Sequence, residues 1–416
     1  MIRNPRENDT VRLMDERVRS LLLAILSDEL TGSDHEIAYP DDSSVMTDLL
    51  RESIHHAVFP LVMDHVLRDQ GESDPDLGLA KKLYRNEIIY QARKTAEFLL
   101  LYEYLCKKGL HPAVMKGIVL RDLYPEPEHR PSADEDLLID ADDFSAYHGI
   151  LQDYGLQAVE NGSDLENEYE VAYEDRERGI YLELHKQLFP PDNWIYRNMS
   201  ALFEGMSGRF ETVNIYGEDI LTIGPTDHLL YLLCHAYKHF IHGGFGIRQV
   251  CDIGMFSDRY GDRIDWGRIR RGCDSIRLSC FSSAIFRIGN NHLGFGMPRE
   301  FSDIETDETA LLDDIMTGGI YGVNDINRAH SANITIGAAA SRKKKGAGIL
   351  SSFFLPYNAM VGRYPYLKKY PWLLPAAWIQ RLFRYLLHRD KSADPSESLR
   401  IGNERVKLME QYGLID

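Results

Sequence analysis

Residues 1–110 carry hydrophobic and polar positions at the spacing of amphipathic helices, with apolar residues returning about every 3.6 positions. Residues 11–30 show one such pattern. Residues 45–70 show a second, which Pro60 interrupts because proline lacks the amide donor of a helix interior. This part of the chain predicts an N-terminal helical region.

The longest helical pattern covers residues 79–108 and ends at Gly109, the position of a helix C-cap. One face of this helix is mostly apolar, and we expect that face to be part of the core. The expected core face comprises Tyr84, Ile88, Ala92, Leu99, Tyr102 and Cys106.

Residues 111–220 differ from the flanking parts, because short apolar runs with a period of two alternate with short helical patterns. Two of the alternating segments are joined by a charged turn, which predicts a β-hairpin. This mixture indicates an α+β core with a small mixed sheet. The predicted strands cover residues 113–116, 136–139, 169–173 and 179–189, and the predicted helices cover 117–123 and 141–154.

Residues 221–330 return to helical spacing and predict a helical domain. We expect a helix over residues 229–241 with Asp227 as its N-terminal cap. Arg248 and Asp252 follow in the next helical pattern, four positions apart, a spacing at which opposite charges form an ion pair.

Four histidines of this region are grouped within a short stretch: His228, His235, His239 and His242. His235 and His239 are one helical turn apart, a spacing that also occurs in zinc sites. Neither an HExxH signature nor a cysteine pair accompanies them, so we interpret them as core or substrate-facing residues.

Residues 331–416 are less regular and predict a basic C-terminal extension of helices and irregular segments. Residues 342–345 are all basic, and the uncharged stretch 346–362 follows. Pro356 interrupts that stretch, which falls short of the roughly 20 apolar residues of a membrane span. Because aromatic and basic residues interleave, residues 342–391 predict either a peripheral membrane contact or a segment packed against the body.

The composition of the 416-residue chain is that of a globular protein of two or three domains, with 44% hydrophobic and 27% charged residues. Its net charge of −17 argues against nucleic acid as a partner. The charge is uneven, since residues 331–391 hold 11 Lys or Arg and one acid, a net +10, which leaves −27 for the rest. The basic segment therefore either contacts an anionic partner or packs on the acidic body of the same chain.

Five cysteines are scattered along the chain without a CxxC pair, which is typical of reduced thiols in the cytoplasm. The first ten residues, MIRNPRENDT, contain no apolar segment of the kind that a secretory signal peptide needs. We therefore expect a cytoplasmic protein, with contact to the membrane surface as the alternative for its basic segment.

The stretch KGIVLRDLYPEPEHRPSADEDLLID, residues 116–140, holds the strongest chemical signal. Asp134 and Asp136 are two positions apart at the start of a predicted strand, so both carboxylates project from one face. Adjacent carboxylates repel each other unless a cation lies between them, and such ligands suit Mg²⁺ together with substrate phosphates. The pair predicts nucleotide chemistry; the alternative is a set of ordinary loop acids.

A third acid, Glu183, lies in the predicted hairpin, where it shares a strand face with His185. Beside the aspartate pair it would complete a metal site or deprotonate a substrate hydroxyl, whereas on an isolated edge strand it would face solvent. Lys116 and Gly117 precede a short helix whose first amides would offer hydrogen bonds to an anion. The candidates for further phosphate contacts are Lys238, His239 and Arg248.

The ordered motifs MKGIVLRDLYPEPEHRPSADEDLLI, LELHKQLF and LLCHAYKHF…GIRQVCDI resemble an uncharacterised nucleotidyltransferase-like family of bacterial proteins, within the polymerase-β-type nucleotidyltransferase superfamily. The resemblance covers about residues 111–256 and reappears in RYPYLKKYPWLLPAAWIQRLFR. It implies transfer of a nucleoside monophosphate from an NTP such as ATP to a hydroxyl or phosphate acceptor, with two Mg²⁺ ions at the reacting oxygens.

The resemblance also implies which residues do this. It matches the metal-binding carboxylates to Asp134, Asp136 and Glu183, and the glycine of the phosphate-approach turn to Gly117. The superfamily usually has a serine after this glycine, whereas this chain has Ile118, and Lys116 would supply charge in place of the missing hydroxyl. The alternatives are a catalytically silent binding or regulatory module, and a peripheral membrane protein acting on a glycan or lipid-linked acceptor.

Overall fold

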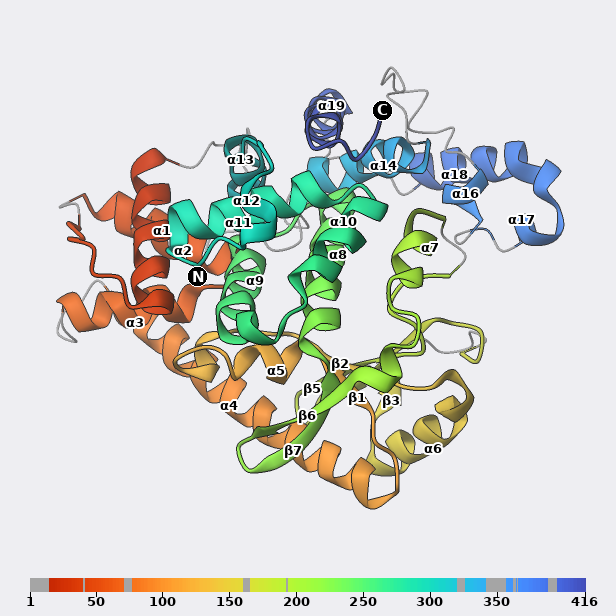
Figure 1. Ribbon diagram of the computed structural model, residues 1–416, viewed down its shortest axis with the longest axis horizontal. Helices are drawn as coiled ribbons and strands as arrows, with labels where there is room; N and C mark the ends of the chain where they lie inside the picture. Colours follow the sequence, from red (N-terminus) through yellow and green to blue (C-terminus); the bar gives the residue numbers. More distant parts are fainter. Residues whose placement is uncertain are drawn as a thin grey trace.

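The computed structural model shows a seven-stranded mixed sheet at one side of the molecule and helices over the remainder (Figure 1). This confirms the expected α+β architecture, with a mixed-sheet core between helical regions. The strand order is β3-β4-β5-β2-β1-β7-β6. The structure describes residues 15–39, 42–70, 77–159, 165–191, 194–319, 326–341, 357–361, 364, 366–387 and 395–416. The strands are β1 (Ala113–Met115), β2 (Glu135–Leu138), β3 (Gln157–Ala158), β4 (Glu170–Asp175), β5 (Ile180–His185), β6 (Phe210–Ile215) and β7 (Glu218–Ile223).

The middle of the sheet fixes the geometry of the site. β2 pairs with β1 in the antiparallel sense and with β5 in the parallel sense, and the second pairing places Asp136 directly opposite Glu183. The predicted hairpin is confirmed as β4 and β5, which pair along their whole length. Facing residues on neighbouring strands have their Cβ atoms close together, so the register brings these two acids side by side.

The two faces of the sheet pack against different helices. Side chains alternate along a strand, so Leu137 of β2 points to one face and Leu138 to the other. Leu137 belongs to a core cluster with the long helix α4 (Gly78–Lys107) and with α6 (Phe144–Tyr154). Leu138 belongs to the larger cluster that is built mainly from helices of the N- and C-terminal parts.

Helix α4 ends at Lys107 with Lys108 as its C-cap, and Gly109, the expected cap, follows with φ 81°. The buried face of the helix differs in part from the expected one. The buried side chains include the polar residues Gln91, Lys94 and Thr95, whereas Ala92 is exposed and Tyr84 is only partly buried. The expected face is wrong for Ala92 but confirmed for four residues that pack in the core: Tyr84, Leu99, Tyr102 and Cys106. The polar residues are buried because Gln91 and Lys94 contact other buried polar groups near β2.

The N-terminal helices are α1 (Glu16–Thr31), α2 (Ser43–His55) and α3 (Phe59–Gln70). The interruption expected at Pro60 lies just before it, where Ala57 adopts a left-handed backbone with φ 52°. Pro60 itself is in the first turn of α3, where a missing amide leaves no hydrogen bond unmade. The expected break is confirmed, and its position moves by three residues.

The helical body above the sheet joins these three helices to the C-terminal ones in one core cluster (Figure 1). The expected cap, Asp227, is wrong: Gly224 is the N-cap, and Asp227 is buried beside Arg209 and Arg268. No helix among the described ranges is long and apolar enough to cross a membrane. The helices are α5 (Gly117–Arg121), α7 (Trp194–Ala201), α8 (Pro225–His242), α9 (Ile247–Tyr260), α10 (Trp266–Ser275), α11 (Ser279–Leu293), α12 (Arg299–Ser302), α13 (Thr309–Gly318), α14 (Ile326–Ser341) and α19 (Pro395–Gln411).

The C-terminal helices α14 and α19 hold the end of α8. Thr335 of α14 donates a hydrogen bond of 2.6 Å to the carbonyl of Ile241. Arg328 of α14 and Arg405 of α19 donate to the carbonyls of Gly243 and Phe240. These donors satisfy carbonyls that a helix end leaves without an intrahelical partner.

A projecting lobe extends from this body and consists of α16 (Tyr357–Met360), α17 (Tyr366–Lys369) and α18 (Leu374–Leu387) (Figure 1). It has a small hydrophobic core of its own. The basic run 342–345, on which part of the membrane prediction rests, lies outside the described residues.

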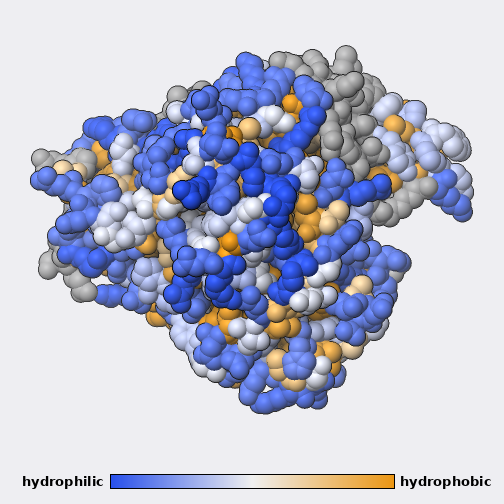
Figure 2. Space-filling model, viewed as in Figure 1, coloured by the Kyte–Doolittle hydropathy of each residue, from blue (hydrophilic) through white to orange (hydrophobic). Residues whose placement is uncertain are grey.

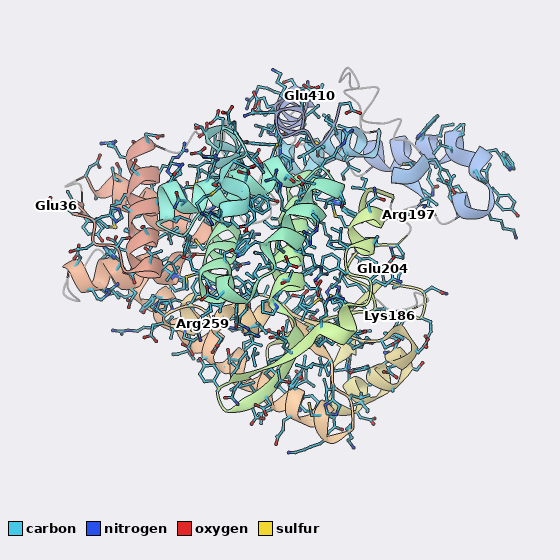
Figure 3. All side chains as sticks on the ribbon, in the orientation of Figure 1. Glu36, Lys186, Arg197, Glu204, Arg259 and Glu410 are labelled. Atoms are coloured by element: carbon cyan, nitrogen blue, oxygen red, sulfur yellow. The ribbon has the colours of Figure 1, made fainter. Side chains whose placement is uncertain are left out.

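Hydrophilic residues cover most of the face shown in Figure 2, and apolar residues occupy small areas between them. Charged side chains such as Glu36, Arg197 and Glu410 lie at the outside of the molecule (Figure 3). All five cysteines are free thiols.

Candidate active site

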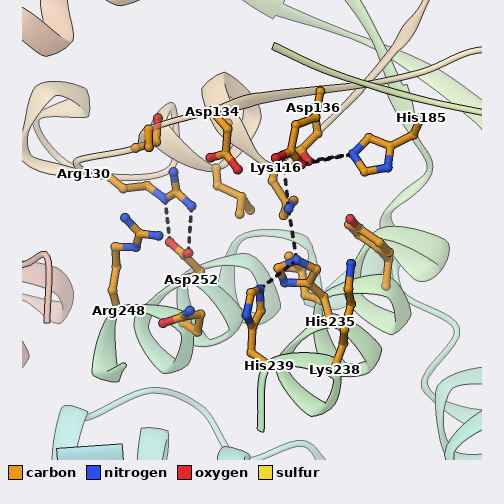
Figure 4. A pocket seen from close by; sticks show the side chains of 18 of the residues that line it. Lys116, Arg130, Asp134, Asp136, His185, His235, Lys238, His239, Arg248 and Asp252 are labelled. Carbon is orange, nitrogen blue, oxygen red and sulfur yellow. Dashed lines mark hydrogen bonds and ion pairs between the residues drawn. The ribbon is translucent and has the colours of Figure 1, made fainter. Parts of the chain in front are cut away.

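A pocket of about 350 Å³ lies between the sheet and helices α8 and α9 (Figure 4). The sheet contributes carboxylates to its wall, and the two helices contribute mainly basic residues. Residues far apart in the sequence therefore meet here. The eight residues predicted to bind metal or nucleotide all line this pocket: Lys116, Gly117, Asp134, Asp136, Glu183, Lys238, His239 and Arg248.

The acidic wall is centred on β2 and β5. Asp136 is buried on β2 and faces Glu183 of β5, while Asp134 lies just before β2 and is partly exposed. The Asp136–Glu183 pair results from the register of two neighbouring strands, whereas strand alternation predicted a shared face only within each strand. Tyr181 and Glu170 extend the same wall.

Three side chains of this wall form a group suited to a metal ion: Asp136, Glu183 and His185 each offer a ligand atom within 4.8 Å of the others. His185 Nε2 lies 3.0 Å from Oδ1 of Asp136 and 3.6 Å from Oε2 of Glu183. Sequence reasoning placed His185 on the face of Glu183 but assigned it no role. The signal was the two-residue spacing on β5. Two carboxylates and one imidazole fit Mg²⁺ or Mn²⁺ when phosphate oxygens complete the ligand set.

Charges inside this group are strongly coupled. Burial alone would raise the pKa of Asp136, but Lys116 and His185 hold it well below its ordinary value. Burial opposes the charge on His185, but hydrogen bonds with Asp136 and Glu183 outweigh burial and raise its pKa to about 9. His185 is therefore protonated at neutral pH in the absence of metal.

Glu183 has the opposite tendency from Asp136. Burial raises the pKa of Glu183, a hydrogen bond from His185 lowers it, and repulsion from Asp136 and Glu170 adds to the rise. The net shift is upward, which makes this carboxylate a stronger base than an exposed one. A proton acceptor for a hydroxyl group needs this property.

Lys116 lies between the acidic and basic walls. Its Nζ is 3.1 Å from Oδ2 of Asp136 and 3.2 Å from Nε2 of His235, and its side chain is 14% exposed. Attraction by Asp136 overcomes burial and keeps the pKa of Lys116 well above its ordinary value. The lysine is thus a permanent cation inside the pocket.

The turn at Gly117 contains an internal anion. Gly117 has φ 44°, and a Cβ added there would lie 2.9 Å from Cδ of Glu135 and closer still to its Oε2. The missing Cβ lets Glu135 accept a 2.8 Å hydrogen bond from the amide of Ile118. Glu135 also pairs with Arg121 and, at 3.4 Å, with Lys94. The amide of Ile118, expected to be open to an anion, is therefore already bonded to a buried carboxylate.

The basic wall comes from α8 and α9. Lys238 and His239 lie on α8 and line the pocket next to His235, whose Nε2 is 3.2 Å from that of His239 (Figure 4). Burial, followed by the charge of Lys116, lowers the pKa of His239 to about 3, so this histidine is neutral. Arg248 of α9 donates to the carbonyl of Pro131.

The ion pair expected between Arg248 and Asp252 is wrong. Asp252 instead accepts two hydrogen bonds from Arg130, of 2.7 and 2.8 Å, and a third from the hydroxyl of Tyr124. A bidentate arginine satisfies both oxygens of a buried carboxylate better than a helical neighbour does. The pair fixes α9 to the loop that leads into β2.

The histidines of α8 do not assemble a metal site within the described part of the chain. His228 Nε2 accepts a hydrogen bond from the amide of Lys116, and His242 Nε2 lies 2.6 Å from the hydroxyl of Tyr196. His235 faces Lys116. The interpretation as core or substrate-facing residues is confirmed for buried His228 and for His235 and His239, which line the pocket, whereas His242 is exposed and lies outside it.

A second group of three potential ligands, Glu52, His55 and His56, lies on α2 and the residue after it. His56 Nδ1 accepts a 3.4 Å hydrogen bond from the amide of Ile247, so the ring proton is on Nε2. A ring in that state has no lone pair for a metal. The geometry instead fits an ordinary contact between Glu52 and His55, which are 3.4 Å apart.

Comparison with known proteins identifies the family of the chain. The family model described as "Uncharacterised nucleotidyltransferase" matches residues 42–294, more than half of the chain, and the chain belongs to that family. The match includes β1, β2 and β5 and both helices that form the basic wall. Neither the curated proteins nor the solved structures contain a match.

Proposed function

We propose that this member of the uncharacterised nucleotidyltransferase family transfers a nucleoside monophosphate from an NTP to a hydroxyl or phosphate group of an acceptor, with Mg²⁺ as cofactor. One observation carries the proposal: a single pocket joins three carboxylates of the sheet to basic side chains of α8 and α9. Transfer of a phosphoryl group requires both features, because charge must be balanced on the metal side and the phosphate side.

The roles follow from the geometry. Asp136, Glu183 and His185 would hold one metal ion, and Asp134 at the open edge would contribute to a second. When bound, such ions stabilise the attacking and leaving oxygens of the displacement. His185 must lose its proton before it can act as a ligand, and Asp136 is already ionised.

The remaining residues bind the donor and prepare the acceptor. Glu183, with its raised pKa, would take the proton from an acceptor hydroxyl if it does not ligate metal. Lys116, Lys238 and Arg248 carry the positive charge that would hold the phosphates, and neutral His239 would donate or accept a hydrogen bond.

Calorimetric titration of each NTP, with and without Mg²⁺, tests the proposal. Wild type is expected to bind one or more NTPs only with Mg²⁺, and Asp134→Ala/Asp136→Ala is expected to lose that binding. The matched control is Asp142→Ala/Asp143→Ala, which removes two exposed acids outside the pocket. Absence of NTP binding by the folded wild type, or equal loss in the control, would contradict the proposal.

One observation favours a second candidate, a silent binding module. Glu135 occupies the amide of Ile118 at the turn where the superfamily was expected to approach phosphate. That amide is therefore not available to a triphosphate at this turn. The two candidates differ in product: an enzyme releases pyrophosphate when NTP and a pool of acceptors are supplied, whereas a silent module binds NTP without turnover.

A further inference from the structure

Lys116 has an unusual backbone for a residue with a side chain. Its φ is 46° and its ψ is −135°, outside the regions that L-residues normally occupy. Such conformations persist where the surrounding structure requires them, and they are frequent at functional sites. Here the backbone directs the lysine side chain into the pocket, between the acids of the sheet and the histidines of α8 (Figure 4).

Both oxygens of Asp136 contact a cationic side chain. Oδ1 lies 3.0 Å from His185 Nε2, and Oδ2 lies 3.1 Å from Lys116 Nζ. Asp136 is also the buried member of the group suited to a metal ion. A divalent cation and an ammonium group cannot share one carboxylate oxygen at such distances without strong repulsion. The Lys116 ammonium on Oδ2 therefore opposes a divalent cation at Asp136, and the cation binds more tightly when the ammonium moves away.

The basic wall of the pocket lies within reach of the Lys116 ammonium. Lys116 Nζ is already 3.2 Å from His235 on the basic wall, whose other members are Lys238, His239 and Arg248. A lysine has a flexible stem and donates readily to phosphate, so rotation of its side chain suffices. A phosphate on that wall would give the ammonium a new anionic partner.

We propose that Lys116 is a tethered counter-ion that blocks the metal site of the resting protein and moves to a nucleotide phosphate when metal and nucleotide bind together. The proposal rests on the proposed function for the identity of the nucleotide, and on the contacts of Lys116 for the block itself. It predicts that metal alone binds weakly and that nucleotide strengthens metal binding. It also makes the protein respond to metal–nucleotide complexes rather than to free metal.

The test is binding of Mn²⁺, followed by electron paramagnetic resonance of the free ion, to the full chain with and without a non-hydrolysable NTP analogue. Lys116→Met keeps the length of the side chain and removes the charge. The charge-matched control is Lys238→Met, which removes a cation of the same pocket whose Nζ makes no ion pair with the acids among the described contacts.

Lys116→Met is expected to bind Mn²⁺ alone about tenfold more tightly than wild type, or more, since a contacting charge is lost. Lys238→Met is expected to change it less than about threefold, because its charge acts from farther away. Wild type should gain at least about tenfold in Mn²⁺ affinity when the analogue is present, and Lys116→Met should gain less. Unchanged or weaker Mn²⁺ binding by Lys116→Met would overturn the proposal.

Three further outcomes are decisive. If Lys116→Met does not fold, the measurement on wild type decides, because equal Mn²⁺ affinity with and without the analogue refutes the coupling of metal and nucleotide binding. If wild type binds no analogue while Lys116→Met still binds Mn²⁺ more tightly, the block by Lys116 stands, and both the transfer to phosphate and the proposed nucleotide chemistry fail. If wild type transfers nucleotide while Lys116→Met binds Mn²⁺ no more tightly than wild type, the proposed nucleotide chemistry stands and the block by Lys116 fails.

A separate observation concerns the projecting lobe defined above. Trp372 is 73% exposed and Tyr370 is 41% exposed, and their rings contact each other with centroids 6.3 Å apart. Lys369 beside them is exposed as well. Exposed tryptophan and tyrosine next to lysine are typical of the interface of a membrane, where ring and charge meet lipid headgroups. The sequence from 331 to 391 adds a net charge of +10 to a chain that is acidic elsewhere.

We infer that the lobe docks on an anionic lipid surface through Tyr370 and Trp372. Flotation with vesicles of phosphatidylglycerol and phosphatidylcholine, against phosphatidylcholine alone, tests this. Wild type should float with the anionic vesicles only, and Tyr370→Ala/Trp372→Ala should lose most of that binding. The control is Tyr216→Ala, which removes an aromatic residue that is 56% exposed in the turn between β6 and β7. The lipid-docking inference is overturned if wild type does not float, if it floats equally with neutral vesicles, or if the double variant binds fully. Absence of flotation by wild type would indicate a protein partner.

Discussion

Replacing Gly117 by alanine should loosen the centre of the candidate site. The new Cβ would overlap Oε2 of Glu135, and the backbone at φ 44° disfavours any side chain. Glu135 cannot retreat easily, because it is fully buried and bonded to Ile118, Arg121 and Lys94.

The magnitude can be worked from these contacts. The left-handed backbone costs about 1–2 kcal/mol for a residue with a Cβ. Displacing the carboxylate from a backbone amide and from buried cations costs roughly another 2–3 kcal/mol, because those groups lose a charged partner. The total is about 3–5 kcal/mol. Gly32→Ala is the control, since Gly32 has φ 69° with nothing near its Cβ position and should show only the backbone cost.

Amide hydrogen exchange measures the two effects separately. Exchange of the peptide that covers β1 and α5 should be about 100-fold or more faster in the Gly117 variant, since each 1.4 kcal/mol of local opening corresponds to about tenfold. The end of α1 should change by about tenfold or less in the Gly32 variant. Equal effects of the two substitutions on their own segments would show that Glu135 does not fill the turn and would refute the reasoning.

Three further outcomes are expected. His185 has a pKa raised to about 9, so the stability that its charge contributes is complete below about pH 6.5 and is lost as pH rises towards 9. His185→Gln should therefore remove the fall in the free energy of unfolding, measured with urea, between about pH 6.5 and 9. An unchanged fall in the variant would contradict this. Because a bound metal displaces the proton of His185, the Mg²⁺ affinity of wild type should rise over the same pH range. Calorimetry in two buffers of different ionisation enthalpy measures the released proton. A pH-independent affinity would exclude His185 as a ligand. Burial would raise the pKa of Asp252, but Arg130 lowers it, so the stabilisation from this carboxylate is present above about pH 4 and lost below. Asp252→Asn should destabilise the protein by about 3–5 kcal/mol at pH 7 and make its stability less dependent on acid pH. A change below about 1 kcal/mol would refute the ion pair.

The sequence was a better guide to the strands of the site than to the helices, where the Asp227 cap and the Arg248–Asp252 pair were wrong. Alternation along a strand predicted one face for Asp134 and Asp136 and one face for Glu183 and His185. The register of β2 and β5 then places Asp136 opposite Glu183. The sequence named Lys238 and Arg248 only as candidates for phosphate contacts, because no local pattern links α8 and α9 to a strand about a hundred residues earlier.

The residues that sequence reasoning missed depend on contacts across the fold. Glu135 lies between the two aspartates and points to the opposite face, where Lys94 of α4 and Arg121 of α5 neutralise it. Its role appears only when the helices are placed. Asp252 likewise has its partner on a distant loop, because Arg130 binds both oxygens, which the helical neighbour Arg248 does not.

The contacts at the end of α8 concern the part of the chain beyond the family match, which ends at residue 294. Arg328 and Arg405 place two positive charges at the negative end of the dipole of that helix, and they bond its last carbonyls. The family core therefore depends for one wall of its pocket on helices that the family model does not include. A chain shortened after residue 294 should retain its sheet while the last turn of α8 frays, which faster amide exchange at residues 238–242 would reveal. Selection acting on the C-terminal helices can thus tune a site that they do not touch.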